Sequence, residues 1–337
     1  MRAFVTGGAG FVGSHIVRLL CRQGAEVRVL VRTATALDNL LDLDVECVYG
    51  DLLDPAPLRR GAAGCDVVYH CAADYRLWTS DPSELYAHNV QGTENMLRAC
   101  AYAGVARVVY TSSVAAVGIP KGGPGCEETP VSLADMIGDY KRSKFLAQKV
   151  ALHHAERGLP VVIVNPSTPI GPGDRKPTAT GQLVVDFLNR AMPAYVDTGL
   201  NLVAVEDVAA GHLLAAEKGI PGRTYILGNQ NLTLKQILDL LGELTGLPSP
   251  GLRMPHLIAL GIGALDSFVE GRLLRRPPRV SLEAVKMSLK KMWFSSERAV
   301  AELGYRPTPV RDALLRACRW FVEHGYAPVP PAFRRAA

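Results

Sequence analysis

Short apolar runs rich in β-branched residues alternate with stretches of helical periodicity along the first half of the chain. Both faces of each run are apolar, which is typical of strands covered by helices on two sides. The intervening stretches are long enough for crossover helices, so consecutive strands are expected to run parallel. The pattern predicts an α/β fold with a doubly wound parallel sheet. Its six predicted strands are Ala3–Thr6, Val27–Val31, Val45–Tyr49, Val67–Cys71, Arg107–Thr111 and Val161–Val164.

This rhythm breaks after Pro166, where proline and glycine cluster. The rest of the chain is mainly helical, with two short strand candidates at Leu202–Val205 and Thr224–Leu227. We predict a first domain at residues 1–165 and a smaller, mainly helical domain at residues 166–337, with part of residues 200–230 returning to the first. Within the first domain, Ser83–Gly104 is expected to be one long helix that ends at its glycine.

Composition excludes several classes of protein. The 337 residues are 48% hydrophobic and 20% charged, which suits a chain with a buried core and excludes disordered and collagen-like chains. The formal net charge is +5, with net −3 over residues 1–252 and net +8 over the remainder. This mild excess does not predict a nucleic-acid partner. Seven scattered cysteines without a paired spacing predict neither a disulfide framework nor a zinc site, and we expect a reducing compartment and no metal.

The sequence indicates no targeting or membrane-spanning segment. Its N-terminus enters a strand at once and lacks the pattern of a signal peptide. The most apolar stretch, His256–Phe268, is interrupted by Gly261, Gly263 and Asp266 and is shorter than the ~20 residues that a span needs. We therefore expect a cytoplasmic protein.

A glycine-rich turn follows the first strand and opens an amphipathic helix. Glycines at such a turn allow the backbone to approach a pyrophosphate, and the first N–H groups of the helix attract its charge. Gly7, Gly10 and Gly13 fit one dinucleotide-binding spacing, whereas Gly8, Gly10 and Gly13 fit another, so the loop alone does not separate the two. With Phe11 and Val12 at the start of the helix, it predicts a bound dinucleotide.

The end of the second strand bears on the choice of cofactor. NAD enzymes usually place an acid there for the adenosine ribose, but this strand ends in Val31 and Arg32. A guanidinium can pair with a 2′-phosphate, so NADP(H) is favoured while NAD(H) stays possible, because Arg32 can also be a solvated charge over the adenine. Asp51 and Leu52 follow the third strand, where an Asp side chain can reach the adenine. Ala72 and Ala73 follow the fourth, where small residues let the backbone pass along the cofactor.

Tyr140 and Lys144 are four residues apart in a helical stretch and therefore share one helix face. An ammonium favours the phenolate form of a nearby tyrosine, and it can also bind the nicotinamide ribose. Serine hydroxyls at Ser112 and Ser113, just past Thr111 at the end of the fifth strand, can hold a substrate oxygen. Together these residues predict hydride transfer coupled to proton transfer.

With these motifs the chain resembles the extended short-chain dehydrogenase/reductases over nearly its full length. The motifs that carry the resemblance are Thr6–Gly13, Asp51-Leu52, Cys71-Ala72-Ala73, Asn89-Val90-x-Gly92-Thr93, Thr111-Ser112-Ser113, Tyr140-x-x-x-Lys144, Pro166 and Gly171-Pro172-Gly173-Asp174. The family implies Ser113, Tyr140 and Lys144 as catalytic residues and a homodimer formed through the long helices. The cofactor contacts that we expect are Gly7, Gly10, Phe11, Val12, Arg32, Asp51, Leu52, Ala72, Ala73, Thr111, Tyr140, Lys144, Pro166 and Ser167.

Within this superfamily the second strand, residues 27–32, is similar to the dihydroflavonol reductase branch, in which the closing Arg binds the NADP phosphate. Sugar-nucleotide epimerases carry Asp at the place of Val31. Residues 74–78 and 165–178 look like the bacterial hopanoid-associated sugar epimerase group inside that branch.

Two loops follow strands four and six and should border the substrate crevice. They supply the substrate candidates Tyr75, Arg76, Trp78 and Arg175, together with Ser113. Tyr75 and Trp78 could equally be there to pack the loop, with no contact to substrate.

The basic and apolar stretch Leu257–Arg279 contains Arg272, Arg275, Arg276 and Arg279. Two interpretations apply to it. It is either a helix that covers the substrate domain with solvated arginines, or a weak peripheral contact with anionic lipid at the inner membrane that admits an isoprenoid substrate.

Three functions remain open on the residues alone. The first is an NADP(H)-dependent reductase or dehydrogenase of a sugar-like or polycyclic substrate. The second is an epimerase or dehydratase that retains its cofactor. The third is a dinucleotide sensor without catalysis, a class that tends to lose the tyrosine and lysine present here.

Overall fold

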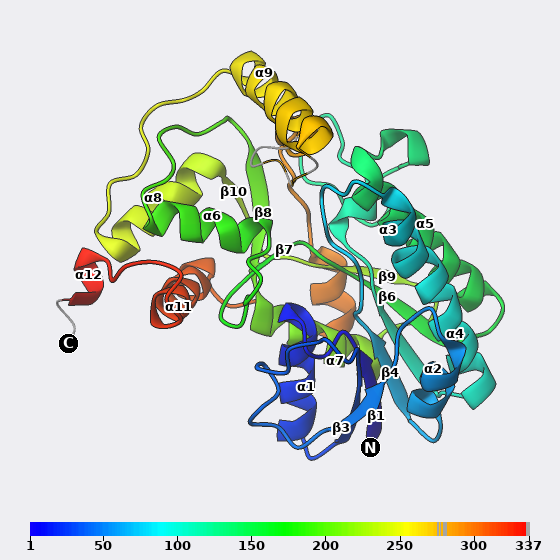
Figure 1. The fold of residues 1–337 in the computed structure, drawn as a ribbon. Coiled ribbons are helices and arrows are strands. Elements are labelled where there is room, and N and C mark those ends of the chain that lie inside the picture. Colours follow the sequence, from blue (N-terminus) through cyan, green and yellow to red (C-terminus); the bar gives the residue numbers. More distant parts are fainter. Residues whose placement is uncertain (275, 277, 279–281, 335–337) are drawn as a thin grey trace.

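The computed structural model describes residues 1–274, 276, 278 and 282–334. Its main feature is a seven-stranded parallel sheet of order β3-β2-β1-β4-β5-β6-β9 (Figure 1). All six strands expected in the first half are present, and the seventh comes from the second half of the chain. The doubly wound parallel sheet is therefore confirmed. The strands are β1 (Arg2–Thr6), β2 (Glu26–Val31), β3 (Glu46–Tyr49), β4 (Val67–His70), β5 (Arg107–Thr111), β6 (Val161–Pro166) and β9 (Thr224–Leu227).

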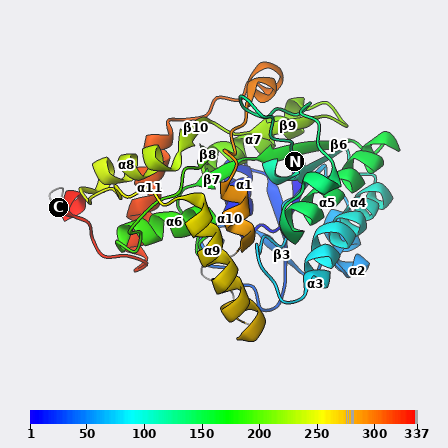
Figure 2. The same cartoon turned by 90° about the horizontal axis from the view of Figure 1, so that it is seen from above.

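Helices cover both faces of this sheet, as the two-sided apolar pattern requires. On one face, α1 (Phe11–Arg22) and α7 (Val205–Lys218) pack together over a buried cluster that includes Ile16, Leu20 and Val208. The other face is covered by α2 (Pro55–Ala62), α4 (Gly92–Ala103) and α5 (Gly138–Glu156), with Met96 and Ala147 among the buried residues. Both layers are visible from above in Figure 2.

The predicted long helix at 83–104 is built from three pieces. It runs through α3 (Pro82–Tyr86), a π-helical turn (Ala87–Gln91) and α4, and it ends at Gly104 in the left-handed conformation with φ 64°. The glycine cap is the one that the sequence indicates. We predicted one continuous helix here and did not predict the wider π turn.

A second, smaller layer holds a three-stranded sheet of order β10-β8-β7. Its strands are β7 (Thr168–Ile170), β8 (Gly199–Ala204) and β10 (Gln230–Thr233), of which β8 was expected and the other two were not. Around a third buried cluster pack α6 (Ala179–Leu188), α8 (Leu234–Thr245) and α11 (Val310–Glu323), with α12 (Pro331–Arg334) beside α8. The chain enters this layer at β7 and returns to the large sheet through α7 and β9.

Two further helices, α9 (His256–Asp266) and α10 (Leu282–Ser288), contact each other (Figure 2). Single turns of 3₁₀ or π helix occur at Val114–Ala116, Leu133–Asp135, Ser267–Leu273 and Ala299–Leu303. In the described residues no helix is both long and apolar enough to cross a membrane.

Candidate active site

The carboxyl ends of β1, β4 and β5 are neighbours in the sheet, and each carries part of the candidate site. At the end of β1, Gly7 has φ 71°, and a Cβ there would lie 2.7 Å from the backbone nitrogen of Ala72. A Cβ on Gly13 would lie 2.1 Å from the carbonyl oxygen of Gly7. Both positions therefore need glycine, and the turn closes tightly through a 2.9 Å hydrogen bond from Gly10 N to Gly7 O.

Helix α1 begins at this turn without a side-chain cap and without an acid in its first turn. The first N–H groups of the helix, at Phe11 and Val12, therefore have no side chain competing for them, and the positive end of the helix dipole is not neutralised locally. Such a turn has the free donors that a pyrophosphate requires.

The three predicted catalytic residues come together beyond β5. Ser113 hydrogen-bonds the phenol of Tyr140. Lys144 Nζ donates to the backbone oxygen of Thr111 at 2.9 Å and lies 5.2 Å from the ring centre of Tyr110. Tyr140 and Lys144 both project from α5, on the same face, as the spacing of four predicts.

Burial shifts the proton affinities of this cluster. Burial raises the pKa of Tyr140, and the hydrogen bond from Ser113 acts in the opposite direction. Lys144 is 3% exposed, and burial lowers its pKa to about 8. Without a ligand, the phenol is therefore protonated at neutral pH, while the lysine gains or loses its proton just above neutrality.

The two serines after Thr111 have different partners. Ser112 is buried and donates to Gln148 Oε1 at 2.6 Å. Asn165 donates to the same Gln148 oxygen at 2.9 Å and to the backbone oxygen of Ser113 at 2.6 Å. The Ser112 hydroxyl is thus used in a hydrogen bond near the ends of the strands, whereas the Ser113 hydroxyl faces Tyr140. Nothing in the sequence pattern singled out Gln148 or Asn165 for this role.

A chain of buried hydrogen bonds links β1, β4 and the π turn. Thr93 donates to the carbonyl of Asn89 at 2.7 Å, so its single hydroxyl proton is used and it accepts from His70 Nε2 at 3.1 Å. His70 Nδ1 then accepts from Thr6 at 2.7 Å, and Thr6 accepts from Ala72 N at 3.2 Å. Burial lowers the pKa of His70 to about 3, which keeps it neutral. His70 is therefore a scaffold residue that links β1 to the π turn.

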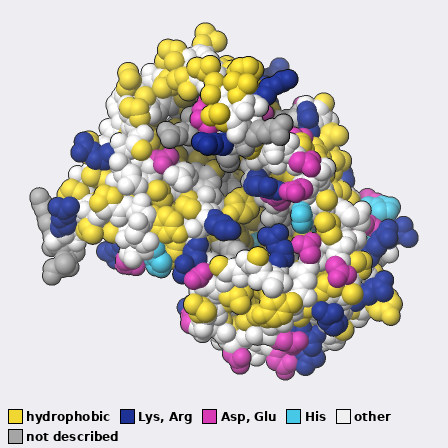
Figure 3. All heavy atoms as spheres, viewed as in Figure 1, with side chains coloured by type: hydrophobic (Ala, Val, Ile, Leu, Met, Phe, Trp, Pro, Cys, Tyr) yellow, Lys and Arg dark blue, Asp and Glu magenta, His cyan; other side chains and the backbone are white. Residues whose placement is uncertain are grey.

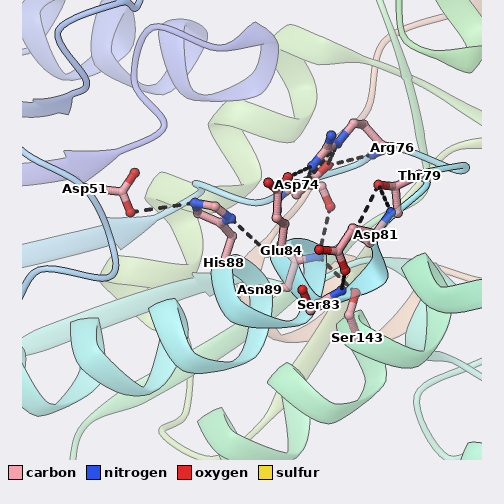
Figure 4. Close-up of polar contacts among 10 residues, drawn as sticks. All are labelled: Asp51, Asp74, Arg76, Thr79, Asp81, Ser83, Glu84, His88, Asn89 and Ser143. Carbon is pink, nitrogen blue, oxygen red and sulfur yellow. Dashed lines mark hydrogen bonds and ion pairs between the residues drawn. The ribbon is translucent and has the colours of Figure 1, made fainter. Parts of the chain in front are cut away.

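Asn89 connects the substrate loop to α5 (Figure 4). Its side chain accepts from Asp74 N at 2.7 Å and donates to Asp74 O at 2.9 Å. It also donates to Ser143 Oγ at 2.9 Å, and Ser143 donates to the backbone oxygen of Tyr140 at 2.8 Å. The π turn brings Asn89 to this position, between the loop after β4 and the first turn of α5.

The remaining predicted cofactor residues follow their strands, and the structure gives each a defined place. Arg32 is exposed at the end of β2. Asp51 accepts from Leu53 N and lies 3.7 Å from His88 Nε2, whereas Leu52 is buried against Gly92. The Thr111 hydroxyl is bonded to Cys71 and His212, so its carbonyl faces the site. Pro166 ends β6, Ala73 begins the loop after Ala72, and the Ser167 hydroxyl is buried without a partner among the described residues.

The substrate candidates divide into two groups. Arg76 is held by ion pairs to Asp74 at 2.5 Å and Glu84 at 3.2 Å, which raise its pKa and leave its charge compensated (Figure 4). Tyr75 is 50% exposed. Trp78 lies close to Gly271 of the π turn that follows α9. These three residues share one loop.

Arg175 belongs to the other group. Its guanidinium lies 3.6 Å from Asp38, in the loop that follows Arg32. A contact between Arg175 and substrate stays a prediction. Of the predicted basic stretch, Arg272 and Arg276 are exposed, while Arg275 and Arg279 lie outside the described residues.

Comparisons with known proteins decide the family. Residues 3–228 match the NAD dependent epimerase/dehydratase family. The chain belongs to this family. It is 47% identical over 328 residues to a putative dihydroflavonol 4-reductase from Synechocystis sp., covering 96% of this chain and 95% of that protein. It is 38% identical over 326 residues to sterol demethylase protein B from Methylococcus capsulatus, and the match covers 96% of this chain and 99% of that protein.

Among solved structures, a nucleoside-diphosphate-sugar epimerase from Pseudomonas aeruginosa, PA4631, superposes with a TM-score of 0.81 at 29% identity. The match covers 97% of this chain and 99% of that one. The expected membership in the extended short-chain dehydrogenase/reductases, in the dihydroflavonol-reductase-like branch, is thereby confirmed. The protein is an NAD(P)-dependent oxidoreductase or epimerase of the epimerase/dehydratase family.

The residues of this family member fit a dinucleotide. The glycine turn is closed so tightly that a Cβ at Gly7 or Gly13 would collide with protein backbone, and the uncapped start of α1 offers its N–H groups. Ser167 adds a buried hydroxyl without a partner in the described structure. For metals the described part of the chain offers no group of three or more His, Cys, Asp or Glu side chains.

Proposed function

We propose that this protein is an NADP(H)-dependent reductase or dehydrogenase that acts on a carbonyl or alcohol carbon of a sugar-like or polycyclic, isoprenoid substrate. The observation that carries the proposal is the cluster of Ser113, Tyr140 and Lys144 at the end of β5, two strands from the glycine turn. When bound, the cofactor would supply or accept the hydride.

The three side chains divide the rest of the chemistry. The Ser113 hydroxyl, already directed at Tyr140, holds the substrate oxygen beside the phenol. Tyr140 donates its proton to that oxygen during reduction, a task that suits a phenol kept protonated by burial. Lys144 binds the ribose of the nicotinamide and places positive charge beside the phenol during the reverse reaction.

The preference for NADP(H) rests on the end of β2. Arg32 is exposed there, and no carboxylate occupies the position of Val31 or Arg32 to repel a 2′-phosphate. Gly7, Gly10, Phe11 and Val12 hold the pyrophosphate in this proposal. Asp51 and Leu52 would contact the adenine. Ala72, Ala73, Thr111, Pro166 and Ser167 would contact the nicotinamide end.

An apolar, polycyclic substrate is supported by two likenesses. A relative of 38% identity is named for sterol demethylation, and the loops at 74–78 and 165–178 resemble the hopanoid-associated group. The alternative is a sugar epimerase or dehydratase that oxidises and reduces its substrate in place, which the similarity to a nucleoside-diphosphate-sugar epimerase favours. A reductase exchanges its cofactor with solution, whereas an epimerase or dehydratase keeps it bound. Retention of oxidised cofactor through purification, without net consumption of NADPH, therefore supports the epimerase.

We further propose a cytoplasmic homodimer that pairs through the predicted helices Ser83–Gly104 and Tyr140–Arg157. In the structure α4 and α5 lie side by side (Figures 1 and 2), and α4 presents Tyr102 with 76% of its surface exposed. All seven cysteines are free thiols, which suits a reducing compartment. Sedimentation analysis of the purified protein tests the dimer.

The decisive experiment is Tyr140→Phe. This variant should lose at least about a thousandfold in turnover while binding NADPH as the wild type does, because only the acidic proton is removed. Turnover is followed by NADPH oxidation with a panel of carbonyl substrates, and binding by NADPH fluorescence. Unchanged turnover would contradict the proposed chemistry, and a wild type that binds cofactor but never turns over would favour a dinucleotide sensor.

A further inference from the structure

Helix α9 and the turn after it present their large apolar side chains to solvent. Of the helix, only Ala259 and Gly263 are buried. The exposed fractions reach 83% for Leu257 and 65% for Leu265, so large apolar side chains of this helix face outward. We call this surface the α9 ridge, made of Leu257, Ile258, Ile262, Leu265, Phe268, Leu273 and Leu274.

The α9 ridge is a continuous surface. Ile258, Ile262 and Leu265 follow the spacing of one helix face, and Leu257 and Phe268 border them. Figure 3 shows apolar side chains gathered over α9 at one extremity of the molecule, and Figure 2 shows the helix extending away from the body. Contiguous apolar patches of this kind mark an interaction surface.

Basic residues outnumber acidic ones in the segment that carries the α9 ridge. Residues 256–291 contain seven Lys or Arg and three Asp or Glu, so this stretch contributes +4 of the net +5 of the whole chain. Arg272 and Arg276 are exposed next to the ridge, and Lys286 lies on α10, which contacts α9. A lipid surface with anionic headgroups complements both the apolar side chains and this charge. A second copy of the chain would instead bring like charges together across a two-fold interface.

The ridge is also connected to the entrance of the candidate active site. A Cβ at Gly271, in the turn after α9, would lie 3.2 Å from the indole nitrogen of Trp78 in the substrate loop. On α10, the Glu283 side chain approaches Gly138, which lies two residues before Tyr140. A Cβ at Gly138 would lie 3.3 Å from Glu283 Cγ. The segment that carries the ridge therefore covers the substrate side of the site.

We propose that the α9 ridge docks on an anionic lipid surface and so places the substrate entrance at the membrane, where a lipid-dissolved carbonyl or alcohol substrate can enter between Trp78 and α10. The apolar side chains insert at the level of the headgroups, and the arginines bind lipid phosphate. The entry of a lipid-dissolved substrate rests on the proposed function, but the docking itself does not.

Vesicle co-sedimentation of the full-length protein tests the docking. Vesicles of phosphatidylcholine alone are compared with vesicles that contain about one third phosphatidylglycerol. Each is tested at low salt and at high salt, where the Debye length falls to about 4 Å. We expect binding to the anionic vesicles that weakens with salt. Leu257→Asp combined with Leu265→Asp should reduce partitioning at least about tenfold. The matched control is Leu41→Asp, because Leu41 is 78% exposed and lies far along the chain from the ridge.

Two results would overturn docking: no binding of the wild type to anionic vesicles at low salt, or equal binding by the ridge variant and the control. If the wild type binds no vesicles and the ridge substitutions lower its sedimentation coefficient, the occupant of the ridge is a second copy of the chain. Circular dichroism establishes that each variant is folded. Turnover of a water-soluble carbonyl should be unchanged by the ridge substitutions. Absence of that turnover in the wild type contradicts the proposed function and leaves the docking result intact.

Discussion

At the scale of single residues, burial determines which proton each candidate catalytic group holds. Lys144 has its pKa lowered to about 8 by burial, while burial raises that of Tyr140. A second lysine on α5, Lys141, is also buried, with its pKa lowered to about 8. These charges are kept in the interior at a cost to the free energy of folding, which is typical of groups retained for chemistry.

Lys144→Met should stabilise the cofactor-free protein at pH 7 while abolishing turnover. Below pH 8 the lysine is charged in both the folded and the unfolded state, so the full burial penalty is present. As pH rises from 8 to about 10.4 the folded state releases the proton first, and the wild type gains stability. After the lost hydrogen bond to Thr111 is deducted, we expect about 1–2 kcal/mol in favour of the variant at pH 7.

Urea unfolding at pH 7 and pH 10 measures this effect. Exposed Lys149, on the same helix, supplies the control Lys149→Met, with a change within about 0.5 kcal/mol. A Lys144→Met variant that is less stable than wild type at pH 7, or that keeps the same rise toward pH 10, would contradict the burial penalty.

Arg32→Ala should weaken NADP(H) binding by about 10- to 100-fold and leave NAD(H) binding almost unchanged, because the guanidinium pairs only with the 2′-phosphate. Fluorescence titration with both reduced cofactors gives the two Kd values. Arg22→Ala, at the exposed end of α1, controls for the general loss of positive charge. Equal weakening of both cofactors would show that Arg32 stacks on the adenine instead.

At the scale of elements, the π turn at Ala87–Gln91 determines how α3 and α4 meet the site. It places Asn89 against the Asp74 backbone and Ser143, and Thr93 beneath it completes the buried chain through His70 to Thr6. The turn therefore ties the loop after β4 to the start of α5. The apolar periodicity predicts one continuous helix there, and the π turn became apparent only in the folded chain.

Thr93→Val tests this element. The substitution keeps the shape but leaves the His70 Nε2–H buried without an acceptor, which should cost about 1–3 kcal/mol in the free energy of unfolding. Turnover should also fall several-fold, since Asn89 positions the first turn of α5.

The control for that variant is Thr245→Val. Thr245 is buried and donates to the carbonyl four residues earlier at 2.6 Å, as Thr93 does, but it lies in α8 within the smaller layer. We expect a loss of stability with unchanged turnover. If Thr93→Val and Thr245→Val affect turnover equally, the π turn has no role in positioning Tyr140.

At the scale of the whole molecule, the segment after β7 folds back onto the glycine turn. His15 bonds the carbonyl oxygen of Pro172 at 2.9 Å. Asn39 donates to Gly173 O at 3.1 Å and to Ala9 O at 3.3 Å. The smaller layer is therefore fastened to the part of the large sheet that binds the cofactor in our proposal, and Figure 3 shows the surface hollowed between the two.

Asn39→Ala should lower the free energy of unfolding by about 1–2 kcal/mol and raise the Kd for NADPH severalfold, because the carbonyl of Ala9 in the glycine turn and that of Gly173 after β7 lose their shared donor. Urea unfolding and fluorescence titration measure both quantities. Asn189→Ala is the control, since Asn189 donates to Val185 O at 2.9 Å and Tyr326 O at 3.0 Å within the smaller layer. The two variants should differ in Kd, and an unchanged Kd in Asn39→Ala would show that the fastening does not affect the cofactor site.

The parallel sheet, the glycine turn and the pairing of Tyr140 with Lys144 could all be predicted from the order of residues. These features depend on neighbours in the chain: a two-sided apolar run, a residue without Cβ, and a spacing of one helical turn. The resemblance already implied Ser113, and the folded chain adds the physical reason, since the hydroxyl of Ser112 is bonded to Gln148. The strands β7 and β10, the proton affinities at the site and the outward face of α9 likewise needed the folded chain, because burial and pairing depend on residues distant in sequence.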